Sequence, residues 1–257
     1  MKLSEQYQAF KTILIKEYLR FVRIWVQTIL PPAITTTLYF IIFGSLIGSQ
    51  IGDMGGVRYM EYIVPGLILM AVITNSYSNV VSSFFGARFQ RYVEEMLVSP
   101  TPSYVILTGY VAGGMARGAV VGLVVTLVSL IFSDITIQNY GLTTLVIILT
   151  SSMFAIAGFI NAIYANNFDD ISIVPTFILT PLTYLGGVFY SINLLPEFWQ
   201  TVSMANPILY MVNAFRYGII GVSDVDVVTA LVIIIAFNIA LFIWALSLLN
   251  RGVGIRN

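Results

Sequence analysis

The sequence contains no cysteine and no histidine, and only 9% of its 257 residues are charged. Without cysteine there are no disulfide bonds, and without either residue the usual zinc sites and imidazole acid–base catalysis are excluded. Hydrolases with a Ser-His-Asp triad are excluded for the same reason. Twelve basic residues balance twelve acidic ones, so the net charge of zero says nothing about an acidic or basic partner. We expect membrane lipid and no nucleic acid among the partners. We expect no catalytic residue and no metal site.

What the sequence has in abundance is apolar residues, at 58% of the chain, with a mean hydropathy of +0.90. Soluble domains have about a quarter of their residues charged, so the composition indicates an all-α integral membrane protein. Six apolar stretches are long enough to cross a hydrocarbon core of roughly 30 Å as helices. These stretches are residues 29–47, 62–85, 105–132, 143–164, 171–189 and 227–249. We predict one transmembrane domain over residues 1–257, with no cleaved signal peptide.

The distribution of Lys and Arg predicts the orientation. Nine lie in the terminal segments and in the second and fourth connections: Lys2, Lys11, Lys16, Arg20, Arg23, Arg88, Arg91, Arg251 and Arg256. Only Arg58 and Arg216 lie in the opposite connections, with Arg117 set aside inside the third span. Short loops rich in Lys and Arg stay in the cytoplasm, so both termini are predicted to be cytoplasmic.

Residues 4–23 have the pattern of an amphipathic interfacial helix. Apolar residues recur every three or four positions, at Tyr7, Phe10, Leu14, Tyr18 and Phe21. Basic residues repeat on another face, at Lys16, Arg20 and Arg23. Such a helix suits a membrane surface. It is either a charged flank that orients the first span or a helix that also contacts a cytoplasmic partner.

The largest cytoplasmic connection, residues 86–103, is predicted to hold a short amphipathic helix. Its charges are Arg88, Arg91, Glu94 and Glu95, its apolar residues include Phe89, Val93 and Met96, and Ser99-Pro100 ends it. A charge cluster of this kind is usually a solvated face. We favour a docking surface, because this connection is the compact folded part of the cytoplasmic side.

Three features interrupt otherwise regular membrane helices. Arg117, inside the third span, is expected to snorkel or to pair with a structural partner rather than to contact substrate. Pro175 and Pro181 are expected to kink the fifth span near a pathway. Between residues 190 and 226, Pro196 and Pro207 separate apolar runs, which predicts two short re-entrant helices on the outer side.

No phosphate loop of the form G-x-x-x-x-G-K-[ST] is present, so the chain is not expected to hydrolyse ATP alone. No carboxylate is clearly buried within a span, which weakens the case for a proton-coupled carrier. A passive channel or a structural membrane protein remains open on these grounds.

One spaced motif resembles the signature of ABC-2 type transporter permeases: Leu185-Gly186-x-Val188, six residues, Leu195-Pro196, ten residues, Pro207-Ile208-x-Tyr210, five residues, Arg216. The resemblance covers essentially the whole chain. Segments such as 168–172, 180–190 and 23–27 are similar to the bacterial YadH-type branch of that family. The family implies a type V exporter-like fold with an interfacial helix, six spans, a coupling helix and re-entrant helices.

The resemblance also implies how such a chain works. A homodimer in the inner membrane would bind two copies of a separate ATPase, which holds the ATP and Mg, so this chain would carry no cofactor. Coupling to the ATPase would fall to Arg88, Arg91, Glu94, Glu95, Met96 and Leu97. The second and fifth spans would line the path. The alternative is a secondary carrier or channel that works without an ATPase.

The outer gate or lid would carry the signature residues Gly186, Gly187, Pro196, Pro207, Tyr210 and Arg216. We expect Arg216 to be a lid anchor or a contact to lipid headgroups, and not a catalytic group.

Overall fold

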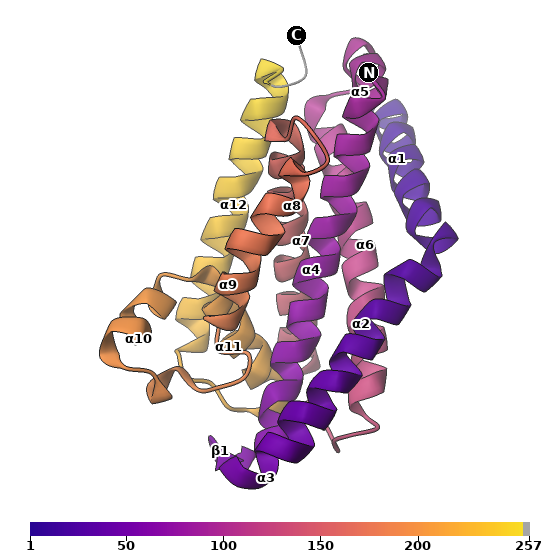
Figure 1. Cartoon of the computed structure of the whole chain (residues 1–257). Helices are drawn as coiled ribbons and strands as arrows, with labels where there is room; N and C mark the ends of the chain where they lie inside the picture. Colours follow the sequence, from indigo (N-terminus) through magenta and orange to yellow (C-terminus); the bar gives the residue numbers. More distant parts are fainter. Residues whose placement is uncertain (254–257) are drawn as a thin grey trace.

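The computed structural model describes residues 1–253, apart from the side chains of Ser45 and Leu97, and this part is almost entirely helical (Figure 1). Arg256, counted above, lies outside it. The long helices are α1 (Leu3–Arg23), α2 (Trp25–Tyr39), α4 (Tyr59–Phe89), α6 (Ser103–Ser129), α7 (Tyr140–Tyr164) and α12 (Val227–Arg251). The shorter ones are η1 (Phe40–Ile47), α3 (Gly48–Ile51), α5 (Tyr92–Val98), α8 (Asp170–Val174), η2 (Pro175–Leu179), α9 (Thr180–Tyr184), η3 (Ile192–Leu194), α10 (Glu197–Met204) and α11 (Pro207–Ile220). A small hairpin pairs β1 (Asp53–Met54) antiparallel with β2 (Val57–Arg58).

Five helical segments within the described residues are long and apolar enough to cross a membrane. They are Trp25–Ile51 (α2, η1 and α3 in succession), Tyr59–Phe89, Ser103–Ser129, Tyr140–Tyr164 and Val227–Arg251. The segment predicted as the fifth of six spans forms α8, η2 and α9 in succession. At 1.5 Å per residue this segment is roughly 22 Å long, shorter than the hydrocarbon core. The count of six spans therefore stays a prediction.

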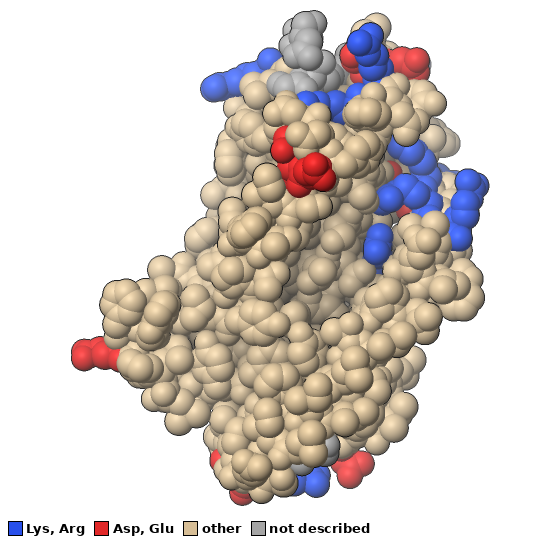
Figure 2. Space-filling view, in the orientation of Figure 1, with Lys and Arg blue, Asp and Glu red and all other residues tan. Residues whose placement is uncertain are grey.

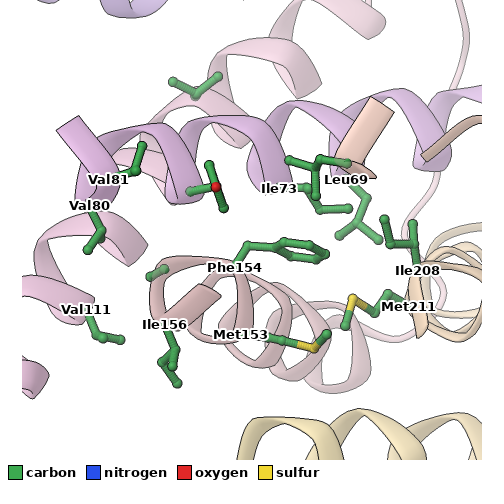
Figure 3. Close-up of a cluster of buried hydrophobic side chains, with 14 of the residues drawn as sticks. Leu69, Ile73, Val80, Val81, Val111, Met153, Phe154, Ile156, Ile208 and Met211 are labelled. Atoms are coloured by element: carbon green, nitrogen blue, oxygen red, sulfur yellow. The ribbon is translucent and has the colours of Figure 1, made fainter. Parts of the chain in front are cut away.

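Helices α4 and α7 occupy the centre of the bundle, with α6, α11 and α12 around them. Figure 3 shows the packing between them: Leu69 and Ile73 of α4 approach Phe154 of α7, and Met211 of α11 lies beside them. The helices α4 and α6 come close because a row of glycines on α6 faces α4, at Gly114, Gly118 and Gly122. Small residues at every fourth position allow this approach.

Helix α1 runs beside the first half of α6 (Figure 1), and a carboxylate is buried in the contact. Tyr7 and Tyr18 are exposed, whereas Glu17 is fully buried and Phe21 is 3% exposed. A Cβ atom at Gly113 of α6 would lie 2.4 Å from the Cβ of Glu17, so the missing side chain makes room for the carboxylate. The predicted helix over residues 4–23 is present as α1, and placement of its exposed apolar residues at the membrane surface stays a prediction.

The bundle has one end rich in positive charge. The N-terminus, the end of α12 and α5 lie together (Figure 1), and blue side chains gather there in Figure 2. We call this the basic end; the hairpin and α3 lie at the opposite end. Exposed Lys2, Lys11, Arg91 and Arg251 contribute to it. The side of the membrane that the basic end faces stays a prediction.

Candidate functional site

Arg216, the last residue of the spaced motif, is fully buried inside the chain. Its guanidinium carbon lies 3.9 Å from the centre of the Tyr62 ring on α4. Its Nε donates to the Tyr62 carbonyl at 3.3 Å, and one Nη donates to the Gly187 carbonyl at 2.5 Å. Contact with lipid headgroups is therefore wrong for this conformation, because the surrounding backbone encloses the charge. The geometry is that of an anchor between α11, α4 and the Gly187 turn.

A carboxylate that the sequence analysis missed completes the anchor. Asp224 accepts a hydrogen bond from the Tyr62 hydroxyl at 3.2 Å and one from Ser191 at 2.8 Å. Its own backbone N–H donates to the Asn213 side chain of α11 at 2.8 Å. Asp224 and Arg216 therefore contact the same side chain, Asp224 at the Tyr62 hydroxyl and Arg216 at the face of its ring. Asp224 is far from Tyr62 in the sequence, so no local pattern identifies the pair.

The turn that follows α9 shows why a glycine pair occurs in the motif. Gly187 has a φ of +71°, a conformation that side chains other than glycine rarely adopt. A Cβ atom at Gly186 would lie 2.8 Å from Ile208 of α11, so α11 packs closely against this turn. The helix ends at Tyr184, before the predicted limit of residue 189, because the chain turns here.

The two short helices expected between residues 190 and 226 are present as α10 and α11. Pro196 precedes α10, and Pro207 is the first residue of α11, where a missing amide donor costs little. Asn206 caps α11 through the Ile208 N–H and donates to the Leu182 carbonyl at 2.6 Å. Tyr210 donates to the Met204 carbonyl at 2.8 Å, which ties α10 to α11. Insertion of these helices into the outer leaflet stays a prediction.

Two groups near this region have shifted acidities. The Thr229 backbone N–H and then its hydroxyl hold the pKa of Asp226 below its usual range, since both donate to the carboxylate at the start of α12. Burial raises the pKa of Tyr190. Asp226 is therefore ionised and Tyr190 is neutral near neutral pH.

The predicted kink residues Pro175 and Pro181 lie in an irregular helical segment. Pro175 opens the π-helical turn η2, and Pro181 lies in α9. The Thr180 backbone N–H and hydroxyl both donate to the Pro175 carbonyl, the hydroxyl at 2.8 Å. The irregularity occurs where the prolines predicted it, while a role beside a pathway stays a prediction.

A cavity of about 300 Å³ lies between α2 and α4. Figure 2 shows the molecule hollowed over α4, with basic side chains along one margin. Helix α2 contributes Gln27, Pro31, Pro32, Thr35, Thr36 and Tyr39 to its lining, and α4 contributes Leu67, Met70, Ala71, Thr74 and Asn75. The lining is therefore mainly apolar, with a few hydroxyl and amide groups.

Aromatic rings border the Tyr39 end of this cavity. The Tyr39 hydroxyl lies 3.3 Å from that of Tyr184 on α9, and both rings contact Phe189, with centroids 5.4 and 5.9 Å away. Phe43 contacts Phe189 as well, at 4.8 Å. This aromatic cluster, made of Tyr39, Phe43, Tyr184 and Phe189, joins the first span to the helix that precedes the Gly187 turn.

The predicted coupling helix is shorter than expected. Helix α4 continues to Phe89, Arg91 takes a left-handed conformation with φ +63°, and α5 begins at Tyr92. The expectation of one helix that includes both Phe89 and Met96 was therefore wrong, because the chain turns between them. Val93 is 1% exposed, and Met96 packs against the core.

The charged residues of this connection separate into two groups. Arg88 donates to the carbonyls of Ala162 and Ile163, at 2.9 and 2.5 Å, and so ties α4 to the end of α7. Arg91, Glu94 and Glu95 are exposed at the basic end. The backbone of Leu97 lies in α5, and its side chain lies outside the described part.

The architecture is that of a multi-pass α-helical membrane protein with a charged helix at one end and a folded helical stretch before the last span. The chain belongs to the ABC-2 type transporter family, whose model matches residues 8–220. It is 57% identical to the inner membrane transport permease YadH of Escherichia coli (strain K12) over 249 residues, 97% of each chain. It is 23% identical to nodulation protein J of Rhizobium meliloti (strain 1021) over 239 residues, 92% of this chain and 90% of that protein.

These comparisons confirm the family resemblance drawn from the spaced motif, and they identify the chain as a transporter permease of the inner membrane. The family implies an ATPase partner. They assign no role to any individual residue, so the coupling and lid residues named above remain predictions.

Proposed function

We propose that this chain forms the transmembrane path of an ATP-driven exporter, as a homodimer bound to two copies of a separate ATPase. The observation that carries the proposal is the position of α5 in a chain of this family. Its exposed Arg91, Glu94 and Glu95 project at the basic end, while Val93 is buried against the bundle. A partner that pushes on α5 therefore pushes on the end of α4.

Two features connect α5 to the bundle. Arg91 makes the turn between α4 and α5, and Arg88 fastens the last turn of α4 to two carbonyls of α7. Hydrogen bonds from a guanidinium are stronger than those between neutral groups. A displacement of α5 is thereby passed to α4 and α7, and α4 also lines the cavity and contacts Arg216.

The homodimer is supported by the open side of the cavity. One chain supplies α2 and α4 as walls. The face between α9 and α2 is hollowed in Figure 2, and a second copy against it would close the path. In this arrangement the short segment formed by α8, η2 and α9, together with the Gly187 turn, makes the remaining one of the six membrane crossings. Helices α10 and α11 form the outer lid. Both termini and the ATPases lie in the cytoplasm.

Charge reversal on α5 tests the coupling assignment. The variant Glu94→Lys with Glu95→Lys should insert normally but lose ATPase co-purification or stimulated hydrolysis in nanodiscs. The matched control is Asp134→Lys with Glu197→Lys, which makes the same charge change at exposed positions distant from the basic end. Normal binding and hydrolysis in the α5 variant would show that the assignment is wrong.

The secondary carrier or channel remains the second candidate, and reconstitution separates the two. In liposomes that contain the permease alone, the exporter proposal expects no transport of any cargo that the complete complex moves with ATP. Transport by the permease alone would contradict it.

A further inference from the structure

A second group of charges lies where α1, α4 and α6 meet, away from both the coupling helix and the Arg216 anchor. Glu17 is buried there and pairs with Arg20 at 3.3 Å and with Lys16 at 3.8 Å. Arg20 also donates to the backbone and side-chain oxygens of Asn79, both at 2.7 Å. Lys16 lies 5.2 Å from the centre of the Tyr110 ring. The single carboxylate is thus shared by two cations.

Arg117 of α6 adds a third cation to this group. It donates to the Asn75 side chain at 3.3 Å. Asn75 and Asn79 are one turn apart on α4, so Arg117 and Arg20 occupy neighbouring positions along that helix. No ion pair among the described residues includes Arg117. It lies roughly 21 Å along α6 from Ser103, too deep for its charge to be left to water at the basic end.

The group has more positive charge and more donors than the chain satisfies. Lys16 and Arg20 pair with the single carboxylate of Glu17, and Arg117 is in none of the ion pairs of the described residues, which leaves an excess of two positive charges. Within the described part of the chain, the buried Nε of Arg117 and Nδ2 of Asn79 have no hydrogen-bond acceptor. A buried donor without an acceptor costs about 1–3 kcal/mol, and an ionised one costs more. An anion is the ligand that would satisfy both deficits.

The position of this group relates it to the α2–α4 cavity. Asn75, which accepts from Arg117, also lines that cavity, and Ala71 and Leu67 continue the lining one and two turns further along α4. Arg20 is 28% exposed, so a ligand has access to it. The charged group therefore adjoins the mainly apolar cavity at Asn75, which belongs to both.

We propose that this site binds an amphiphile with a phosphate monoester head, held by Arg20 and Arg117, and with an apolar chain in the α2–α4 cavity. A phosphate monoester carries about −1.5 to −2 charges at neutral pH, which matches the excess of two, whereas a carboxylate would neutralise only half. Its oxygens also suit the planar fork of arginine. The site does not depend on the coupling role of α5.

Binding to the purified chain in detergent tests the proposal, with dioctanoyl phosphatidic acid as the probe and native mass spectrometry as the measurement. We expect phosphatidic acid to bind and dioctanoyl phosphatidylcholine not to bind. Arg117→Gln and Arg20→Gln should each weaken binding at least about tenfold, the loss of one charge-assisted hydrogen bond. Arg23→Gln, an exposed arginine on the same helix, is the matched control and should bind normally.

Further arms separate the possible sources of the anion. Ala71→Leu narrows the cavity and should weaken binding of phosphatidic acid. If soluble glycerol phosphate binds as well as phosphatidic acid, the site takes free phosphate and the amphiphile is wrong. If decanoate binds as well, the phosphate head is wrong. Equal losses in Arg23→Gln would show that binding is unspecific surface attraction.

Should Arg117→Gln fail to fold, Arg117→Lys is the alternative variant. It keeps the positive charge and loses the planar guanidinium, so it is expected to bind phosphatidic acid more weakly than the native chain.

Discussion

The guanidinium of Arg216 lies over the Tyr62 ring, with its central carbon 3.9 Å from the ring centre. The same guanidinium binds carbonyls of Tyr62 and Gly187. Helix α11 is therefore fixed to the start of α4 and to the turn after α9 through one side chain. Because that side chain is enclosed by the fold, its contribution is to hold the outer region together.

Replacing Arg216 with Gln should destabilise this region without affecting the ATPase surface. The change removes two hydrogen bonds made by a buried charged group, which costs about 2–3 kcal/mol. Thermal unfolding in detergent should show a lower Tm. The milder Tyr62→Phe keeps the ring under Arg216 and removes only the bond to Asp224, so its loss should be smaller. Loss of ATPase co-purification in Arg216→Gln would contradict the separation of lid and coupling roles.

Replacing Gly187 with Ala should also weaken the lid region. With φ at +71°, a Cβ atom strains the backbone, and such substitutions cost on the order of 1 kcal/mol or more. Gly86→Ala is the matched control, because a Cβ atom there meets nothing within 4 Å and the position is helical. The control should be neutral or slightly stabilising in the same unfolding measurement. Equal losses in both variants would show that the turn imposes no special demand on residue 187.

The sequence alone predicts the long helices closely. Residues 143–164 and 227–249 were expected to be helical and form α7 (Tyr140–Tyr164) and α12 (Val227–Arg251). Hydropathy over a span-length window is strong enough to give such results. The fifth predicted span is the exception. Its helix ends at Tyr184 before the left-handed turn at Gly187, but the sequence stays apolar past that point, so hydropathy does not reveal the end.

The contacts that organise the sites depend on distant residues and are less predictable. Glu17 is buried because α6 offers a glycine opposite it. A signal was available, since Ile13, Glu17 and Phe21 recur every four positions on one face, but the exposed aromatic residues of α1 gave a competing pattern. Asp224 and Tyr62 meet only through the tertiary fold.

The hydroxyl contact between Tyr39 and Tyr184 should link α2 to α9. Each of Tyr39→Phe and Tyr184→Phe removes the same hydrogen bond and keeps both rings against Phe189. A double-mutant cycle on unfolding free energy should therefore give a coupling energy of about 0.5–1.5 kcal/mol, the usual value for one such bond. The pair Tyr39→Phe and Tyr210→Phe serves as the control cycle, since Tyr210 bonds to Met204 instead. Strict additivity in the Tyr39–Tyr184 cycle would show that the hydroxyl contact contributes nothing to the free energy of unfolding.

Replacing Glu17 with Gln should release α1 from the bundle. The carboxylate is fully buried, accepts from Ser83 and Arg20, and is the only negative charge within reach of Lys16 and Arg20 among the described residues. Its loss leaves Lys16 and Arg20 without a negative partner at the α1–α6 contact. Removing one partner of a buried ion pair costs about 3–5 kcal/mol. The cost is smaller here, because Arg20 is partly exposed to solvent. Limited proteolysis within residues 1–24 should become faster while the rest of the chain stays protected. Glu5→Gln, an exposed carboxylate on the same helix, should leave the cleavage rate unchanged. If Glu17→Gln is cleaved no faster than Glu5→Gln, apolar contacts such as Ile13 with Gly109 hold α1 without the charges.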